Sequence, residues 1–100
     1  MTVTTGTSAL VTISAGNSFS QVAASNQYMS FVVSGATTLA AADARSSTAT
    51  SPTGGYGTPL SRTFKVTGLT AGVNVFTAQY RVNGSTGTFE NRDITVVGVA

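Results

Sequence analysis

The sequence predicts an all-β protein folded as one β-sandwich domain, with a jelly roll as a candidate arrangement of its strands. Two observations indicate this fold class. Thr, Ser, Val and Gly dominate the composition, whereas the helix formers Lys, Glu, Gln and Leu are few, and this bias favours pleated strands joined by polar turns. Apolar and polar residues also alternate with a period of two along several stretches, as in half-buried strands. The length of 100 residues fits a single domain spanning residues 1–100.

Three stretches of the N-terminal half are predicted strands. Apolar and polar side chains alternate in residues 9–13, and residues 28–33 are rich in aromatic and β-branched side chains. Residues 19–23 predict a further short strand, which follows a turn of Ala, Gly, Asn and Ser at residues 15–18. Residues 1–7 are expected to form an extended arm.

The middle of the chain is predicted to be irregular. Residues 36–45 contain a Leu-Ala-Ala-Ala run that favours one or two helical turns. A short isolated helix is marginal in water, so a loop or an irregular strand is expected here. Residues 46–59 are rich in Ser, Thr, Gly and Pro and are expected to form a flexible loop. Tyr56 in this loop is a candidate anchor for a partner, because aromatic residues dominate interface hot spots; the alternative is a solvated loop without a binding role.

The C-terminal part carries the strongest strand pattern. Residues 61–67 alternate as a strand, and residues 68–72 form a connection bounded by two glycines. Residues 73–82 follow as a long strand. The Asn-Gly dipeptide at residues 83–84 is the one most favoured for a tight hairpin. Residues 88–99 are therefore expected to return as the partner strand.

One face of this predicted hairpin is expected to be buried. The residues concerned are Phe76, Tyr80, Val82, Ile94 and Val96. Phe89 and Ile94 have opposite parity along the returning strand. Either a β-bulge near residues 90–92 brings both side chains to the same face, or Phe89 packs on a second covered face.

The charged residues are few and scattered along the sequence. The net charge is +2, and the five cations are Arg45, Arg62, Lys65, Arg81 and Arg92. Nucleic-acid-binding proteins concentrate their cations on one face or in one run, so no nucleic-acid partner is expected. Residues 1–10 lack the basic and apolar regions of a signal peptide, and no apolar run has the roughly 20 residues needed to cross a bilayer. The chain is therefore expected to be soluble, without a membrane partner.

Residues that usually carry catalysis or hold metals are scarce. The chain has no Cys and no His, which removes thiolate sites, the usual general base and the commonest metal ligand. Glu90 and Asp93 could form a two-carboxylate site, but nothing in the sequence supplies an environment that would tune them. No catalytic residue, metal site or cofactor is expected, and the chain is predicted not to be an enzyme. The absence of Cys is typical of assembly in a reducing cytoplasm.

The distribution of charge suggests a covered surface. Every charged side chain lies at or beyond Asp43, so the first 42 residues carry none. Soluble monomers usually scatter charges over their strands, partly to block edge-to-edge pairing. An uncharged portion therefore suggests contact with another subunit, and Val3, Val11 and Ile13 are the candidate contact residues. The alternative is that abundant Ser and Thr keep this surface soluble unaided.

Four segments carry a family resemblance. They read VSGATTLA at residues 33–40, VTGLTAG at 66–72, FTAQYRV at 76–82 and GTFENRDITV at 87–96. These segments resemble small β-rich virion proteins of tailed bacteriophages, which decorate the capsid or associate with the tail.

The resemblance implies a non-enzymatic capsid decoration protein that binds the major capsid protein and cements the coat lattice. It also implies self-association, with a homotrimer as the expected oligomer, because lattice-covering proteins suit threefold positions. The implied location is the capsid surface of a virion assembled in the host cytoplasm. The alternative is a tail- or fibre-associated carbohydrate- or receptor-binding module, which the lack of a collagen-like stalk or a tail-anchoring helix disfavours.

Overall fold

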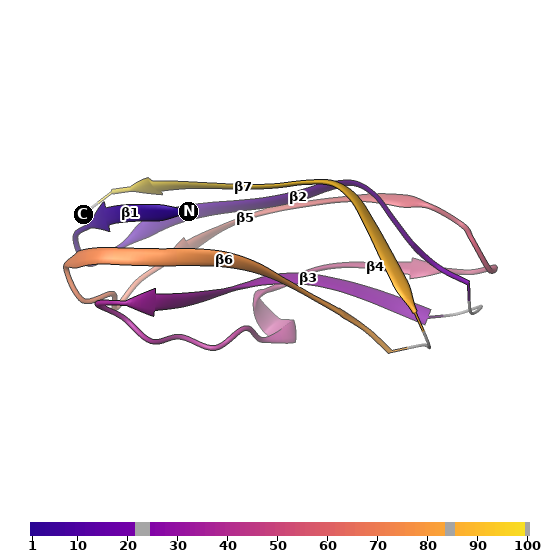
Figure 1. Cartoon of the computed structure of the whole chain (residues 1–100), viewed down its shortest axis with the longest axis horizontal. Helices are drawn as coiled ribbons and strands as arrows, with labels where there is room; N and C mark the ends of the chain where they lie inside the picture. The colour runs from indigo at the N-terminus through magenta and orange to yellow at the C-terminus, as the bar shows by residue number, and fades with distance from the viewer. Residues whose placement is uncertain (22–24, 84–85, 100) are drawn as a thin grey trace.

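The computed structural model describes residues 1–21, 25–83 and 86–99 and shows two antiparallel sheets packed face to face (Figure 1). The strands in this part of the chain are β1 (Thr2–Thr5), β2 (Ala9–Ser20), β3 (Ser25–Gly35), β4 (Ser47–Ser51), β5 (Thr58–Val66), β6 (Gly72–Val82) and β7 (Gly87–Gly98). A short 3-10 helix, η1 (Asp43–Arg45), precedes β4. The prediction of an all-β sandwich is confirmed. Within the described ranges, no helix has the length and apolar character to cross a membrane.

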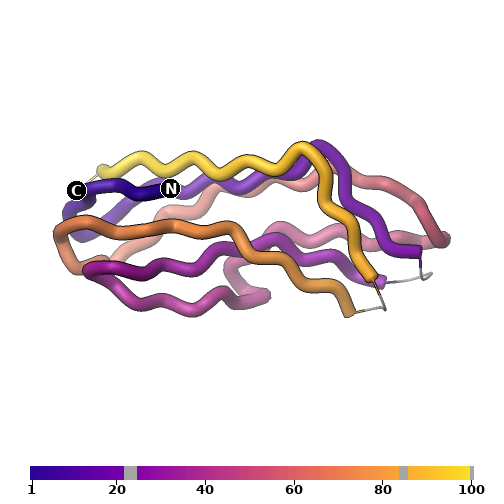
Figure 2. Tube along the Cα trace, viewed as in Figure 1, coloured from indigo at the N-terminus to yellow at the C-terminus, as the bar shows by residue number. Residues whose placement is uncertain are grey.

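The strands pair in a nested pattern. β3 pairs with β4, β2 with β5 and β1 with β6, all antiparallel, so the chain follows the path of a long hairpin rolled over itself. The resulting sheets have the orders β1-β6-β3-β4 and β5-β2-β7. Figure 2 shows the chain crossing repeatedly between the two layers. Nested pairing of this kind is that of a jelly roll, with seven strands in the described residues instead of the usual eight.

The core between the sheets is built around three phenylalanines. The ring of Phe31 on β3 lies 5.5 Å from that of Phe64 on β5 and 6.4 Å from that of Phe76 on β6, measured between centroids. Val11 and Ile13 on β2 belong to the same cluster and are fully buried. Because Phe31 and Phe64 come from opposite sheets, their contact joins the two layers, and removal of these side chains from water is the main force that holds the layers together.

Buried polar side chains lie toward the two ends of this core. Gln27 donates from Nε2 to the carbonyl of Ser25 at 2.9 Å and accepts a bond from the hydroxyl of Ser51 at 3.3 Å. At the opposite end, Asn74 on β6 donates from Nδ2 to the hydroxyl of Thr5 at 2.8 Å. Polar groups are costly to bury without partners, so these bonds make the packing of both ends possible. The bond between Asn74 and Thr5 also ties β1 to β6.

The residues expected to form an N-terminal arm belong to the four-stranded sheet. β1 pairs with β6 from Thr2 opposite Val75 to Thr5 opposite Gly72. The ladder is extended by a bond from the amide of Phe76 to the carbonyl of Met1, at 2.8 Å. The first residues are therefore extended, and their hydrogen bonds go to a strand of the same chain.

β2 continues where the sequence predicts a turn. The predicted turn at residues 15–18 is wrong, because β2 runs through it to Ser20. Up to Ala15 the odd-numbered side chains face the core, and beyond it the even-numbered ones do. Gly16 fits the crowded point of reversal, where a Cβ would lie 3.1 Å from the Cβ of Asn91 on β7. Asn91 itself has a φ of 51°, in the left-handed region that Asn tolerates better than most residues.

The same point explains the opposite parity of Phe89 and Ile94. Both side chains are partly buried against the core, and the change of side falls at Asn91, within the predicted residues 90–92. The register of β7 on β2 does not shift there. Instead, β2 has one extra residue relative to its other neighbour, β5, between Ala15 and Ser18 at the level of the reversal. β7 bends sharply in its first half in Figure 1.

The predicted hairpin between β6 and β7 is wrong. The two strands are consecutive in sequence, but β6 lies beside β3 and β7 lies beside β2 in the other sheet. An Asn-Gly dipeptide favours a chain reversal, but it does not specify which strand the returning chain pairs with. Residues 84–85 lie outside the described part of the chain. Pairing with β2 allows β7 to cover the core from the second layer, which a hairpin with β6 would not.

Burial along β6 decreases toward its C-terminal end. Phe76 and Val96 are buried as predicted, whereas Val82 and Ile94 are half-buried. The predicted burial of Tyr80 is wrong, because its side chain is 37% exposed. Its ring packs at the edge of the core against a phenylalanine of β7, with centroids 4.9 Å apart. The crossing of β7 to the other sheet leaves this end of β6 less covered than a hairpin partner would.

The predicted flexible loop at residues 46–59 is only partly a loop. β4 occupies Ser47–Ser51 and pairs with β3, and β5 begins at Thr58. Every second side chain of β4 is buried, including Ala49. These side chains are too small and too polar to produce the hydrophobic alternation by which strands are recognised. Their burial depends on the opposite sheet, which a local pattern does not contain.

Two further segments complete the path of the chain. Of the predicted strand at residues 19–23, the first two residues end β2, and residues 22–24 lie outside the described part. Residues 36–45 are irregular, as predicted. They form one isolated bridge between Leu39 and Val33 and end in η1.

Replacement of Phe76 by Ala is expected to lower the free energy of unfolding by about 3–5 kcal/mol, because the ring is fully buried and lies next to Phe31. Urea unfolding followed by circular dichroism measures the loss. Tyr80→Ala is the control, since its partly exposed ring should cost clearly less. Equal losses for the two variants would contradict the facing of β6 described above.

The reversal at Asn91 gives a second expectation. Asn91→Gly should leave the free energy of unfolding nearly unchanged, because Gly adopts positive φ without strain. Asn91→Val should lower it by about 1–2 kcal/mol, because a β-branched side chain is strained there. Thermal unfolding of the two variants measures the difference. A Val variant as stable as the Gly variant would show that the backbone at this position is not constrained to positive φ.

Candidate interaction surface

The outer face of the three-stranded sheet carries exposed aliphatic side chains side by side. Leu10 on β2 is paired with Val97 on β7, and the two are 39% and 54% exposed. Val99 follows beyond the end of β7 and is 47% exposed; by the alternation of the strand it lies on the same side as Val97. These three residues are called the aliphatic cluster below. Single exposed aliphatic residues are normal, whereas adjacent ones mark contact surfaces.

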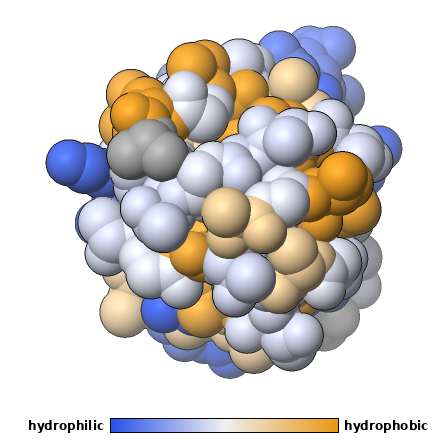
Figure 3. Space-filling view, turned by 90° about the vertical axis from the view of Figure 1, so that its left-hand side faces the viewer, coloured by the Kyte–Doolittle hydropathy of each residue, from blue (hydrophilic) through white to orange (hydrophobic). Residues whose placement is uncertain are grey.

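Hydroxyl side chains adjoin the aliphatic cluster. Thr63, Thr12 and Thr95 lie abreast on β5, β2 and β7, and the hydroxyls of Thr12 and Thr63 are 2.8 Å apart and hydrogen-bonded. Lys65 on β5 lies beside Leu10. Figure 3 shows the end of the molecule where β1 and the chain termini lie, with separate apolar areas among paler side chains and most strongly hydrophilic groups at the rim. The face around the cluster therefore combines hydroxyl groups with one charged neighbour of Leu10, Lys65.

The four contact residues predicted from the sequence have different surroundings. Val11 and Ile13 are fully buried in the core, so their assignment as contact residues is wrong. Val3 on β1 is partly buried and packs against the same core. Tyr56 is exposed, at 55%, and its carbonyl accepts a bond from the hydroxyl of Ser51 at 3.1 Å. An alternating pattern predicts burial, and for Val11 and Ile13 the covering layer comes from the same chain.

The aliphatic cluster was not among the predicted contact residues, although the sequence contains a signal for it. Leu10 occupies the polar side of its strand, next to the inward-facing Val11. Val97 likewise follows the inward-facing Val96. An aliphatic residue on the solvent side of a half-buried strand breaks the period-two pattern. The two breaks become one surface only because β2 and β7 are neighbours in the sheet.

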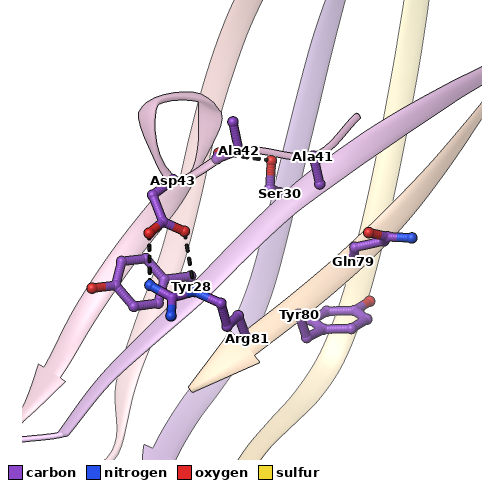
Figure 4. A pocket seen from close by; sticks show the side chains of 8 residues that line it. All are labelled: Tyr28, Ser30, Ala41, Ala42, Asp43, Gln79, Tyr80 and Arg81. Carbon is purple, nitrogen blue, oxygen red and sulfur yellow. Dashed lines mark hydrogen bonds and ion pairs between the residues drawn. The ribbon is translucent and has the colours of Figure 1, made fainter. Parts of the chain in front are cut away.

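A pocket of about 240 Å³ lies on the outer face of the four-stranded sheet (Figure 4). β3 and β6 form its floor, and the segment that leads into η1 forms one wall. Arg81 makes two bonds to the carboxylate of Asp43, from Nη2 at 2.6 Å and from Nε at 3.2 Å. The same guanidinium lies 4.3 Å from the centroid of the Tyr28 ring. Gln79 and Tyr80 line the opposite side.

The contacts of Arg81 limit what this pocket can bind. Its guanidinium is held by Asp43, and it also lies over one face of Tyr28, a ring that would otherwise offer a stacking surface. Both side chains of the ion pair are more than half exposed, so the pair contributes at most about 1 kcal/mol to stability. The volume is below the range of roughly 300–1,000 Å³ that is typical of ligand pockets. The pocket therefore fits a structural role for η1 better than a binding role.

A larger groove, of about 440 Å³, runs along β5. It is lined by residues 62–67 on one side and by Leu39 and Arg45 on the other. Three of the five cations, Arg45, Arg62 and Lys65, therefore lie around one groove. In the sequence they form no continuous basic run. This groove is called the basic groove below. Cations that are scattered along the sequence are thus partly brought together by the fold.

Two arginines of the basic groove are held by the chain itself. Arg62 donates from Nη1 to the carbonyl of Ser46 at 2.9 Å, and its guanidinium lies 4.4 Å from the centroid of the Phe64 ring. Arg45 donates from Nη2 to the carbonyl of Ala40 at 2.6 Å. These contacts orient both guanidinium groups without neutralising their charge.

The carboxylates are distributed over the other surfaces. Asp43 binds Arg81, and Glu90 accepts a bond from the amide of Asn17 at 3.1 Å. Asp93 lies on β7 opposite Ser14. Among the described residues, no three metal-ligating side chains are grouped.

Comparison of the chain with protein-family models, with curated proteins and with solved structures found no match. The structure itself defines the class as a two-layer β-sandwich with the nested pairing of a jelly roll. The aliphatic cluster and the basic groove are the two surfaces of this domain with features that favour a partner.

Proposed function

We propose that this chain is a non-enzymatic virion structural protein that decorates the capsid by docking its aliphatic cluster on the coat lattice. The observation that carries the proposal is the exposure of Leu10, Val97 and Val99 next to one another on the outer face of the three-stranded sheet. Covering such a face is favourable by about 25 cal/mol for each Å² of apolar surface removed from water. The neighbouring threonines add hydroxyl groups that can bond to a partner's main chain.

The fold and the sequence resemblance support this choice among binding functions. Jelly rolls serve as domains of viral capsids and of lectins, and a fold alone does not define a function. The segments that resemble tailed-phage virion proteins include residues 87–96, which form most of β7. Val97 follows this segment directly and belongs to the aliphatic cluster.

The mechanism is binding itself. A protein that binds the assembled lattice but not free coat subunits stabilises the assembled state by mass action. We further propose a homotrimer, whose three copies present three aliphatic clusters to symmetry-related coat subunits. Simultaneous contacts raise the apparent affinity far above that of one cluster, provided that the spacing of the copies matches the lattice.

The pocket beside η1 is the observation that favours the alternative, a tail- or fibre-associated module for a carbohydrate or receptor. Its carboxylate, its amide and the ring of Tyr28 are the kinds of group that bind sugars. The guanidinium of Arg81 already lies over Tyr28 and holds Asp43. A sugar would have to displace both contacts, so we favour decoration.

Val97→Asp is expected to weaken binding to purified capsids assembled without this chain by about tenfold or more, because a carboxylate would be desolvated in the contact. Val73→Asp is the matched control, since Val73 is equally exposed, at 53%, but lies on the four-stranded sheet. Co-sedimentation with the capsids measures both variants. Equal binding by the two variants would contradict docking through the aliphatic cluster, and binding to glycans instead of capsids would favour the alternative.

The proposed oligomer is tested separately. Multi-angle light scattering of the purified chain at high concentration should give the mass of three copies. A mass of one copy under these conditions would contradict the homotrimer and would leave docking as single copies.

A further inference from the structure

The basic groove follows a strand edge. β5 is the last strand of its sheet and pairs only with β2 among the described residues. The groove is lined by consecutive residues, 62–67, and therefore by residues that face both sides of the strand. A cavity on one face of a sheet would be lined by alternate residues. The hollow thus lies along the edge of β5, where a strand would continue the sheet.

The charge in this groove is uncompensated. The three cations Arg45, Arg62 and Lys65 line it, and no carboxylate of the described residues forms an ion pair with any of them. The nearest acidic residue in sequence, Asp43, binds Arg81 on the outer face of the four-stranded sheet. The formal charge of the groove is therefore +3, more than the net +2 of the whole chain.

The groove also has apolar surface. Phe64 and Val66 are buried side chains of β5 that line it from the core side, and Leu39 lines it from the irregular segment between β3 and η1. Arg62 is held in place by the ring of Phe64 and the carbonyl of Ser46, so its remaining donors need little ordering to bind an anion. Arg45 has a buried Nε without a hydrogen-bond partner in the described part of the chain, and its guanidinium is therefore only partly held.

We propose that the basic groove binds an extended acidic segment of a partner protein, which adds to the edge of β5 as a further strand. The main chain of the segment pairs with β5, in the mode of β-augmentation. Its carboxylates bind the guanidinium groups and the ammonium of Lys65, and charge-assisted bonds of this kind are the strongest available to a surface site. Carboxylates on one side of the added strand lie toward Arg45 and Arg62, and those on the other side lie toward Lys65, because Arg62 is paired with the inward-facing Ile13 and Lys65 with the outward-facing Leu10.

A protein segment fits these features better than a nucleic acid. Phosphates would use the three cations, but they would leave the edge of β5 without main-chain partners. Three cations also provide a modest charge for nucleic-acid binding, which depends on the number of phosphates neutralised. Only an extended peptide uses the charge and the strand edge together.

The inference rests on the proposed function only for the source of the segment, which would be the coat subunit. Binding of a peptide is measured with the isolated chain, and docking through the aliphatic cluster is measured with capsids. A negative result in one assay therefore does not contradict the proposal that the other assay tests. Lys65 borders both surfaces, being the neighbour of Leu10 on β5, so the capsid assay uses Val97 and the peptide assay relies first on Arg62.

The test uses a short labelled peptide of repeated Glu-Glu-Val, which presents carboxylates on both sides of an extended strand, with fluorescence anisotropy as the readout. Arg62→Gln and Lys65→Gln should each weaken binding, and the double variant should weaken it by about tenfold or more, with less binding at high salt. Arg92→Gln is the matched control, because it removes one charge at the opposite edge of the sheet and should change the affinity by less than about twofold. Thermal unfolding confirms that each variant is folded, and the single Lys65 variant remains informative if loss of the Arg62–Phe64 contact destabilises the fold.

Two further probes separate strand addition from simple charge attraction. The same peptide methylated on alternate backbone nitrogens keeps its charge but cannot pair with β5, and it should lose most of its affinity. A peptide in which Lys replaces every Glu should not bind. The proposal is overturned if the methylated peptide binds as well as the parent, if the Arg62 and Arg92 variants behave alike, or if single-stranded oligothymidylate of equal charge binds more tightly than the acidic peptide.

Discussion

The contact of Phe31 with Phe64 and Phe76 joins the two sheets at the centre of the core. Phe31 and Phe76 lie on neighbouring strands of one layer, and Phe64 lies on the other. In a domain of this size the buried apolar surface is limited, so a few large rings carry much of it. The chain reaches this contact by its nested pairing, which brings β3, β5 and β6 together from distant parts of the sequence.

The reversal at Gly16 and Asn91 determines the shape of the second layer. Two neighbouring strands change their buried side at the same level, so their mutual register is kept while β7 bends. The bend carries Phe89 onto Tyr80 and places Arg92 over the same tyrosine, 5.4 Å from its centroid. One glycine and one residue in the left-handed region thus close the end of the sandwich that the crossing from β6 to β7 leaves open.

The two surfaces proposed for binding result from how polar residues are distributed over this small core. Much of the outer surface carries Ser and Thr, which require neither burial nor a partner. Against this background the aliphatic cluster and the basic groove differ from their surroundings, one by hydrophobicity and the other by uncompensated charge. They meet at Lys65, which lies beside Leu10 and also lines the groove. One partner of sufficient size could therefore cover both surfaces at once.

Sequence patterns predicted the fold class, the strands around Phe31, Phe64 and Phe76, and the burial of Phe76, because alternation and composition act over a few neighbouring residues. It did not determine that β7 pairs with β2, that β4 is a strand of small residues, or that Val11 and Ile13 are covered by their own chain. It also did not show that Arg45, Arg62 and Lys65 share a groove, or that Leu10 and Val97 are neighbours. Each of these depends on contacts between residues far apart in the chain. Such contacts are set by the packing of two layers around one core, which a local sequence pattern does not contain.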